Sequence, residues 1–126
     1  MKLFSGLTML AMTLFAFSAN ADFRPYAKTD FESAMTAGNT VVVDFHANWC
    51  PTCKKQEPAL NEIVNMKGYE KVVALKADFD QEKELKKSLN VSKQSTIIVF
   101  KGGKEVGRNT GVTAKDELKK LIDMGL

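Results

Sequence analysis

Cys50 and Cys53 are the only two cysteines of the 126-residue chain, and they lie three positions apart in the stretch DFHANWCPTCKKQ (residues 44–56). The same stretch contains the only tryptophan, Trp49, and the only histidine, His46. Such a pair of thiols can form a structural disulfide, bind a metal ion or exchange disulfides with a partner. A disulfide that closes so short a loop stabilises a fold by roughly 2 kcal/mol in the chain-entropy model, less than a bridge over a longer loop. A purely structural disulfide is therefore disfavoured.

The residues around the cysteines predict a strand followed by a helix. The segment TVVVDFHA (40–47) is a nearly continuous run of strand-forming residues, as in a strand buried on both faces of an α/β sheet. Apolar side chains recur at helical spacing after Cys53. Cys50 would begin this helix, where unpaired backbone N–H groups and the positive end of the helix dipole favour a thiolate. We therefore predict that Cys50 is a solvent-accessible nucleophile and that Cys53, one turn further on, resolves the mixed disulfide.

The rest of the chain alternates between strand and helix patterns. A capping box with Thr29 as N-cap predicts a helix that ends near Ala37, and Thr113 is predicted to cap a final helix. Two glycines within 101–104 predict a tight hairpin. The other predicted elements are strands at 71–79, 95–100 and 105–111, a possible strand at 24–26, a helix at 81–89, and a kink at Pro58 in the helix after the cysteines. This order predicts an α/β fold whose mixed sheet carries helices on both faces.

Together these features resemble the thioredoxin superfamily over almost the whole chain after residue 21. The resemblance is carried by VVVDFHANWCPTCKK (41–55), by Pro58, by LKADFDQ (75–81) and by STIIVFKGGKEVGRNTG (95–111). It implies a thioredoxin-like α/β fold with a central mixed β-sheet flanked by helices on both faces. It also implies a thiol–disulfide oxidoreductase that uses a redox-active Cys50–Cys53 disulfide and needs no other cofactor.

The resemblance also assigns roles to side chains around the disulfide. It places Asp44 beneath the disulfide, where burial in an apolar strand would raise the pKa of the carboxyl and let it accept the Cys53 proton. Lys76 would lie beside the disulfide and moderate that effect. His46 stands two residues after Asp44, so it faces the same side of the strand and lies nearer the cysteines. Because histidine titrates near neutral pH, we hypothesise that His46 tunes the redox step.

The predicted substrate-facing residues are Trp49, Pro51, Gln94 and Ser95, while Pro51 and Thr52, between the cysteines, are expected to tune the reduction potential. Ser95 stands where the superfamily has a cis-proline. A cis bond before a residue other than proline costs about 2.5–4 kcal/mol, so we predict a trans Gln94–Ser95 peptide and a locally rearranged loop. The N–H and the hydroxyl of Ser95 are both expected to reach the thiolate.

Residues 1–21, MKLFSGLTMLAMTLFAFSANA, predict a cleaved secretory signal peptide. Lys2 precedes an apolar run, and Ala19-Asn20-Ala21 matches the small-residue cleavage pattern. The thioredoxin-like domain would then be residues 22–126, exported to a bacterial periplasm. Without Lys2, the 18 Lys and Arg residues become 17, against 15 Asp and Glu residues. This near balance, on helix-like faces, argues against nucleic acid as a partner.

Two functional alternatives stay open beside a reductase of protein disulfides. An oxidant of the same fold would run the reaction in the opposite direction. A metal-binding protein would use Cys50, Cys53, His46 and Ser95 for copper(I), or share a zinc or iron–sulfur site between two chains. The reductase is favoured, as a monomer that receives electrons from a membrane-embedded thiol reductant.

Overall fold

The computed structural model describes residues 22–126, and the predicted signal peptide lies outside the described residues. The strands are β1 (Arg24–Pro25), β2 (Val41–His46), β3 (Val73–Asp78), β4 (Thr96–Lys101) and β5 (Lys104–Thr110). The helices are α1 (Lys28–Thr36), α2 (Pro51–Val64), α3 (Lys83–Ser88) and α4 (Lys115–Asp123). None of the helices in this part of the chain is both long and apolar enough to cross a membrane.

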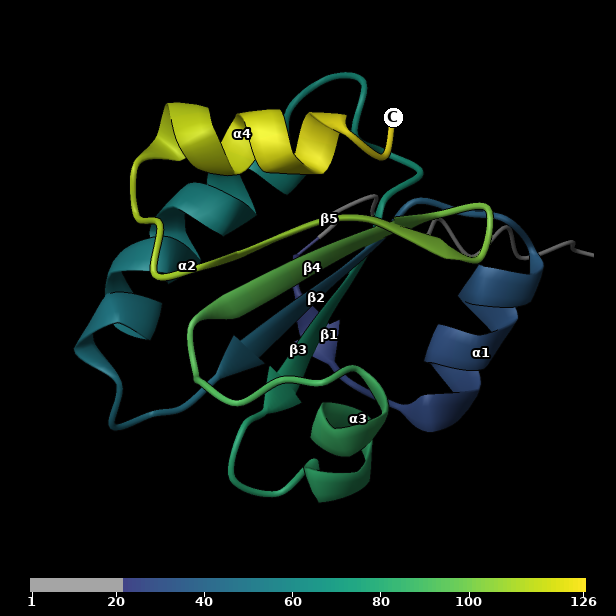
Figure 1. The fold of residues 1–126 in the computed structure, drawn as a ribbon. Coiled ribbons are helices and arrows are strands. Elements are labelled where there is room, and N and C mark those ends of the chain that lie inside the picture. The colour runs from purple at the N-terminus through teal and green to yellow at the C-terminus, as the bar shows by residue number, and fades with distance from the viewer. Residues whose placement is uncertain (1–21) are drawn as a thin grey trace, which may run out of the picture.

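The five strands form one mixed sheet in the order β1-β3-β2-β4-β5 (Figure 1). The central strand β2 pairs in parallel with β3 and antiparallel with β4. All six residues of β2 are buried, which explains its unbroken run of strand-forming residues. The predicted mixed sheet, its short extra strand β1 and its edge strand β5 are therefore confirmed.

Helices cover both faces of the sheet, as predicted. Side chains of α2 and α4 pack against Val42 on one face, and side chains of α1 and α3 pack against Val41, Val43 and Phe45 on the other. Because side chains alternate along a strand, Asp44 and His46 share the face of Val42, which α2 covers. The fold thus places the carboxyl and the imidazole under the helix that the cysteines begin.

The two predicted threonine caps are wrong. Helix α1 begins before Thr29, with Ala27 as N-cap and no side-chain capping bond. The Tyr26 N–H still donates to the Lys76 carbonyl at 2.9 Å, so the chain leaves the sheet and enters the helix at once. At α4 the N-cap is Ala114, one residue after Thr113. At α1 the sheet contact of Tyr26 thus outweighed the capping preference of threonine.

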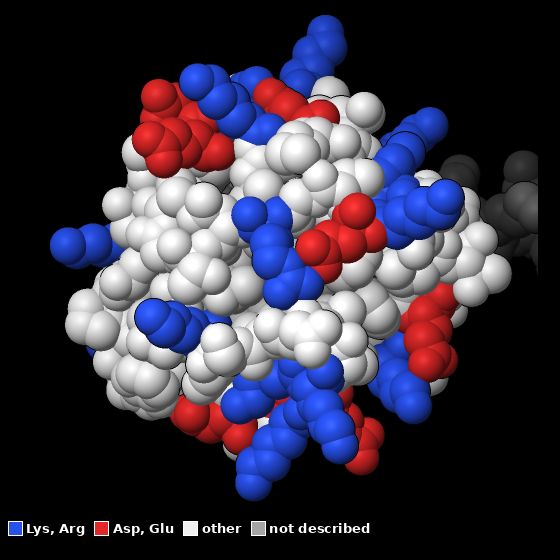
Figure 2. Space-filling view, viewed as in Figure 1, with Lys and Arg blue, Asp and Glu red and all other residues white. Residues whose placement is uncertain are grey.

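Basic and acidic side chains are interspersed over the face drawn in Figure 2, with uncharged surface between them. This distribution agrees with the nearly balanced composition.

We expect Leu118→Ala to destabilise the fold by about 2–5 kcal/mol, because the side chain is fully buried between α4 and the sheet and its loss leaves a cavity. Urea unfolding of both variants measures the effect. The matched control is Leu126→Ala, since Leu126 is 57% exposed and its truncation should cost less than about 0.5 kcal/mol. Equal losses for the two variants would contradict this description of the core.

Candidate functional site

Cys50 is the residue at which the chain turns from the β2 side of the sheet into α2. It is the N-cap of α2, with extended backbone angles, and Pro51 occupies the first helical position. Its sulfur accepts a hydrogen bond from the Cys53 backbone N–H at 3.1 Å. The predicted position of Cys50 at a helix N-terminus, with Cys53 one turn further on, is therefore confirmed.

Both cysteines are buried free thiols, so the structure describes the reduced form. Cys50 is 1% exposed and Cys53 is 0% exposed, and they pack with Ala47 and the partly buried Phe79. The prediction that Cys50 is open to solvent is wrong for this conformation. A partner's disulfide can contact the Cys50 sulfur only if the surrounding side chains or loops move aside.

The Cys53 thiol holds its proton firmly. Burial is the main cause that raises the pKa of Cys53 to about 12, followed by its hydrogen bond with Cys50. Its sulfur lies 3.9 Å from the Phe45 carbonyl oxygen. The charge of Asp44 also raises the pKa of Cys53, so the thiol and the carboxylate are electrostatically coupled. Cys53 therefore needs a base before it can attack another sulfur.

Asp44 has the properties of that base. It is 2% exposed, and its Oδ1 atom is buried with no hydrogen-bond partner. Burial raises the pKa of Asp44 to about 7, while Lys76 lowers it and Glu57 raises it by weaker charge interactions. The predicted rise in this pKa is confirmed. A carboxyl that titrates near neutral pH can accept a proton in one step and release it in the next.

Lys76 is expected beside the disulfide. It lies beside Asp44, and its ammonium group pairs with a different carboxylate, that of Glu57. Asp44 and Lys76 are neighbours in the β2–β3 register. The Lys76 Nζ atom lies 3.0 Å from the Glu57 Oε1 atom on α2. Asp44, Glu57 and Lys76 line a cavity of about 240 Å³, which gives the buried carboxyl a polar surrounding at the edge of α2.

His46 belongs to the same polar cluster. Its Nε2 atom lies 4.0 Å from the Glu57 Oε2 atom, and its Nδ1 atom is buried without a hydrogen-bond partner. Burial lowers the pKa of His46, and the charge of Lys76 lowers it further. The prediction that His46 faces the same side as Asp44 is confirmed. The described ion pair of His46 is with Glu57. Redox tuning by His46 stays a hypothesis, and such tuning would act through the Glu57 carboxylate.

The predicted substrate-facing residues lie at the cysteine end of the molecule, but they differ in exposure. Trp49 is 57% exposed, and its Nε1 atom donates to the Asp80 Oδ2 atom at 2.7 Å. Pro51 is exposed, Thr52 and Gln94 are half-buried, and Ser95 is buried. Trp49 and Pro51 are therefore open to a partner, whereas Ser95 offers little surface.

The segment around Ser95 shows how the chain does without a proline. The described residues contain no cis peptide bond, so the predicted trans Gln94–Ser95 bond is confirmed. Ser95 has φ +61°, a left-handed conformation that is uncommon outside glycine. Its N–H donates to the Phe45 carbonyl at 2.8 Å and its hydroxyl donates to the Gln94 carbonyl at 2.5 Å. The expectation that both groups reach the Cys50 sulfur is therefore wrong.

The sequence suggests Cys50, Cys53, His46 and Ser95 as candidate metal ligands. Within residues 22–126, no group of three or more His, Cys, Asp or Glu side chains is arranged to hold a metal ion. His46 lies beside Glu57 instead.

Sequence reasoning missed three residues of this site: Gln56, Glu57 and Asp80. Glu57 pairs with Lys76, Asp80 holds the Trp49 indole, and Gln56 is a fully buried amide in α2. Only Gln56 carried a usable signal, because it follows Cys53 by three residues and so must face the same side of the helix.

We expect Asp44→Asn to stabilise the fold at high pH only. The pKa of Asp44 is about 7 in the folded chain and about 3.9 in an unfolded chain, so the folded chain keeps a proton that the unfolded chain releases between these values. Stability therefore falls as the pH rises from about 4 to about 7. The substitution should raise the free energy of unfolding by up to about 4 kcal/mol near pH 8 and change it little near pH 4.

Urea unfolding at both pH values tests this expectation. Asp116→Asn is the control, because Asp116 is exposed in the first turn of α4 and should change stability by less than about 1 kcal/mol. The same stabilisation at both pH values would show that Asp44 is not the titrating group.

Comparison with known proteins agrees with this geometry. The thioredoxin family model matches residues 22–124. The chain is 38% identical over 96 residues to a thioredoxin of Chlamydia muridarum, covering 76% of this chain and 91% of that protein. It is 40% identical over 83 residues to thioredoxin H2-1 of Oryza sativa subsp. japonica, covering 66% of this chain but 58% of that protein. The crystal structure of Trxlp from Edwardsiella tarda superposes with a TM-score of 0.76 at 35% identity, covering 78% of this chain and 95% of that one. The chain belongs to the thioredoxin family, whose members are protein disulfide oxidoreductases.

Proposed function

We propose that this protein reduces disulfides of other proteins, with Cys50 as the nucleophile and Cys53 as the resolving thiol. The observation that carries the proposal is the placement of the two thiols. Cys50 lies at the N-terminus of α2 with its sulfur bonded to the Cys53 N–H, and a buried carboxyl with a pKa of about 7 is coupled to the second thiol.

The reaction balances with these groups alone. The Cys50 thiolate attacks one sulfur of the partner's disulfide, which forms a mixed disulfide and releases the partner's other sulfur as a thiolate. Cys53 then gives its proton to Asp44 and attacks the Cys50 sulfur. This second step forms the Cys50–Cys53 disulfide and releases the partner's second thiolate, so that two electrons have passed to the partner. A thiol reductant must supply two electrons before the next cycle.

The direction of electron flow belongs to the proposal. The similarity to thioredoxins over nearly the whole described chain supports a reductant over an oxidant of the same fold. Reduction potentials of such dithiol couples run from about −270 mV for thioredoxin to about −120 mV for DsbA. Equilibration of the Cys50–Cys53 couple with glutathione buffers measures the potential. We expect a value nearer to thioredoxin, and a value near that of DsbA would reverse the assignment.

We further propose that residues 1–21 direct the chain to the periplasm and are removed there. The mature protein would act as a monomer and receive electrons from a membrane-embedded thiol reductant. The family match begins at residue 22, which supports a domain that starts after the proposed signal peptide. Fractionation of cells, with intact mass of the purified protein, tests export and cleavage. Full-length protein in the cytoplasm would contradict both.

We expect Cys53→Ala to accumulate a mixed disulfide with insulin and Cys50→Ala to form none. Only Cys50 begins the helix, and without Cys53 the first adduct has no resolving thiol. Non-reducing gel electrophoresis after mixing each variant with insulin measures the adduct. Adduct formation by Cys50→Ala alone would reverse the assigned order of the two thiols.

We expect Glu57→Gln to shift the pH dependence of the resolving step to lower pH. Removing this charge takes away a group that raises the pKa of Asp44, and it frees Lys76 to lower that pKa further. Because Glu57 is 41% exposed and water screens its charge, the midpoint should fall by less than about one pH unit.

Single-turnover release of the partner's second thiol across the pH range gives this midpoint. Glu62→Gln is a matched control, because Glu62 also lies on α2 and pairs with a lysine, Lys115, away from Asp44. A midpoint that stays fixed or rises in Glu57→Gln would contradict the role of the Lys76–Glu57 pair.

A further inference from the structure

Gln56 joins the cysteine helix to two other segments of the chain. It is 0% exposed and lies one turn after Cys53 in α2. Its Nε2 atom donates to the Ser95 carbonyl at 3.2 Å and to the Val112 carbonyl at 2.8 Å. The two N–H donors of one buried amide thus connect α2, the turn before β4 and the loop after β5.

This amide is a costly choice for stability alone. Its Oε1 atom is buried and has no hydrogen-bond partner. A buried acceptor without a partner costs about 1–3 kcal/mol, whereas an apolar side chain of similar shape would avoid that cost. An apolar side chain would in turn leave the Val112 carbonyl without this donor, so the amide serves to hold the segments that carry the two carbonyls.

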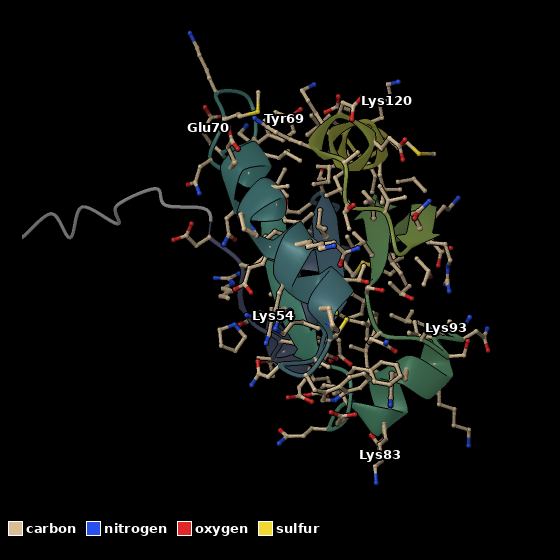
Figure 3. The ribbon with its side chains drawn as sticks, turned by 90° about the vertical axis from the view of Figure 1, so that its left-hand side faces the viewer. Lys54, Tyr69, Glu70, Lys83, Lys93 and Lys120 are labelled. Atoms are coloured by element: carbon tan, nitrogen blue, oxygen red, sulfur yellow. The ribbon has the colours of Figure 1, made fainter. Side chains whose placement is uncertain are left out.

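One of the two carbonyls that Gln56 holds, that of Ser95, belongs to a residue whose N–H is bonded beside the cysteines. The Ser95 N–H donates to the Phe45 carbonyl, whose oxygen also lies 3.9 Å from the Cys53 sulfur. The Ser95 carbonyl accepts a second hydrogen bond, from the Gly111 N–H at 3.1 Å. Figure 3 shows Lys54, at the start of α2, and Lys93, just before this turn, toward the same end of the molecule. Gln56 thus lies behind the surface that surrounds the thiols.

Ser95 requires such external restraint. It is held at φ +61°, where a side-chain-bearing residue is strained, and serine has no ring to fix its backbone. Contacts with Phe45, Gly111 and Gln56 hold its N–H and its carbonyl from three different segments. Of these three contacts, only that with Gln56 comes from a side chain, so it can be removed by substitution.

We propose that Gln56 is a positioning residue for protein substrates. It fixes the Ser95 turn and the Val112 loop relative to Cys50, so that an extended chain bearing a disulfide meets a preformed backbone surface. A small disulfide that contacts only the Cys50 sulfur does not use this surface. The inference rests on the proposed reduction of protein disulfides and names a residue that positions the protein substrate.

The test compares two substrates in the full-length mature protein. We expect Gln56→Met, which keeps length and volume but removes both donors, to raise the KM for insulin about tenfold, the equivalent of one or two lost hydrogen bonds. The rate with hydroxyethyl disulfide should stay within about twofold of wild type, because this small substrate needs only the thiols. The matched control is Asn65→Leu. Asn65 Nδ2 also donates two hydrogen bonds, to Asp22 and to the Asn61 carbonyl, both at 2.8 Å, but at the other end of α2 and exposed.

An unchanged insulin KM in Gln56→Met, or a parallel loss with both substrates, would overturn the proposal. If Gln56→Met does not fold, Gln56→Glu tests the proposal instead. Its carboxyl can donate a hydrogen bond in place of the amide only when it is protonated. The ratio of the insulin KM of Gln56→Glu to that of the wild type should be smaller near pH 6 than near pH 9. The same ratio at both pH values would overturn the proposal. Wild-type protein that does not reduce insulin would refute the proposed function, whereas wild-type protein that reduces insulin with the same KM as Gln56→Met would refute the role of Gln56 alone.

Discussion

The hydrogen bond from the Cys53 backbone N–H to the Cys50 sulfur is the contact on which the whole site depends. It forms because β2 ends at His46 and α2 begins at Pro51, which makes Cys50 the residue where the chain enters the helix. Strand β2 is paired on both edges and buried on both faces, so it gives the junction little freedom. The centre of the sheet, rather than a mobile surface loop, therefore sets the position of the reactive sulfur.

The polar cluster under α2 explains how one buried carboxyl can exchange a proton at neutral pH. Asp44 is deeply buried, and burial is the main cause that raises its pKa to about 7. The charge of Lys76 lowers this pKa, and that of Glu57, with which Lys76 is paired, raises it. The carboxyl can therefore accept the proton of Cys53 near neutral pH. The thiol chemistry thus depends in part on Glu57, a residue that contacts neither sulfur.

The turn before β4 replaces one kind of backbone restraint by another. A proline fixes its own φ through its ring, whereas Ser95 keeps an unfavourable φ only because neighbouring segments hold it. The loop geometry is then a property of the assembled domain, shared among Phe45, Gly111 and Gln56. Cys50 itself is covered in the reduced form, where it packs with Ala47 and Phe79.

Sequence reasoning alone predicts the strand–helix junction at the cysteines, the order of strands and helices, the raised pKa of Asp44 and the trans bond before Ser95. Each of these follows from local apolar periodicity, from burial in a continuous apolar run, or from the cost of a cis peptide bond. The burial of Cys50, the caps of α1 and α4, and the partners of Glu57 and Gln56 follow instead from how the folded domain packs. The contacts of Glu57 and Gln56 join residues that are 19, 39 and 56 positions apart. No local sequence pattern indicates which distant groups the folded sheet brings together.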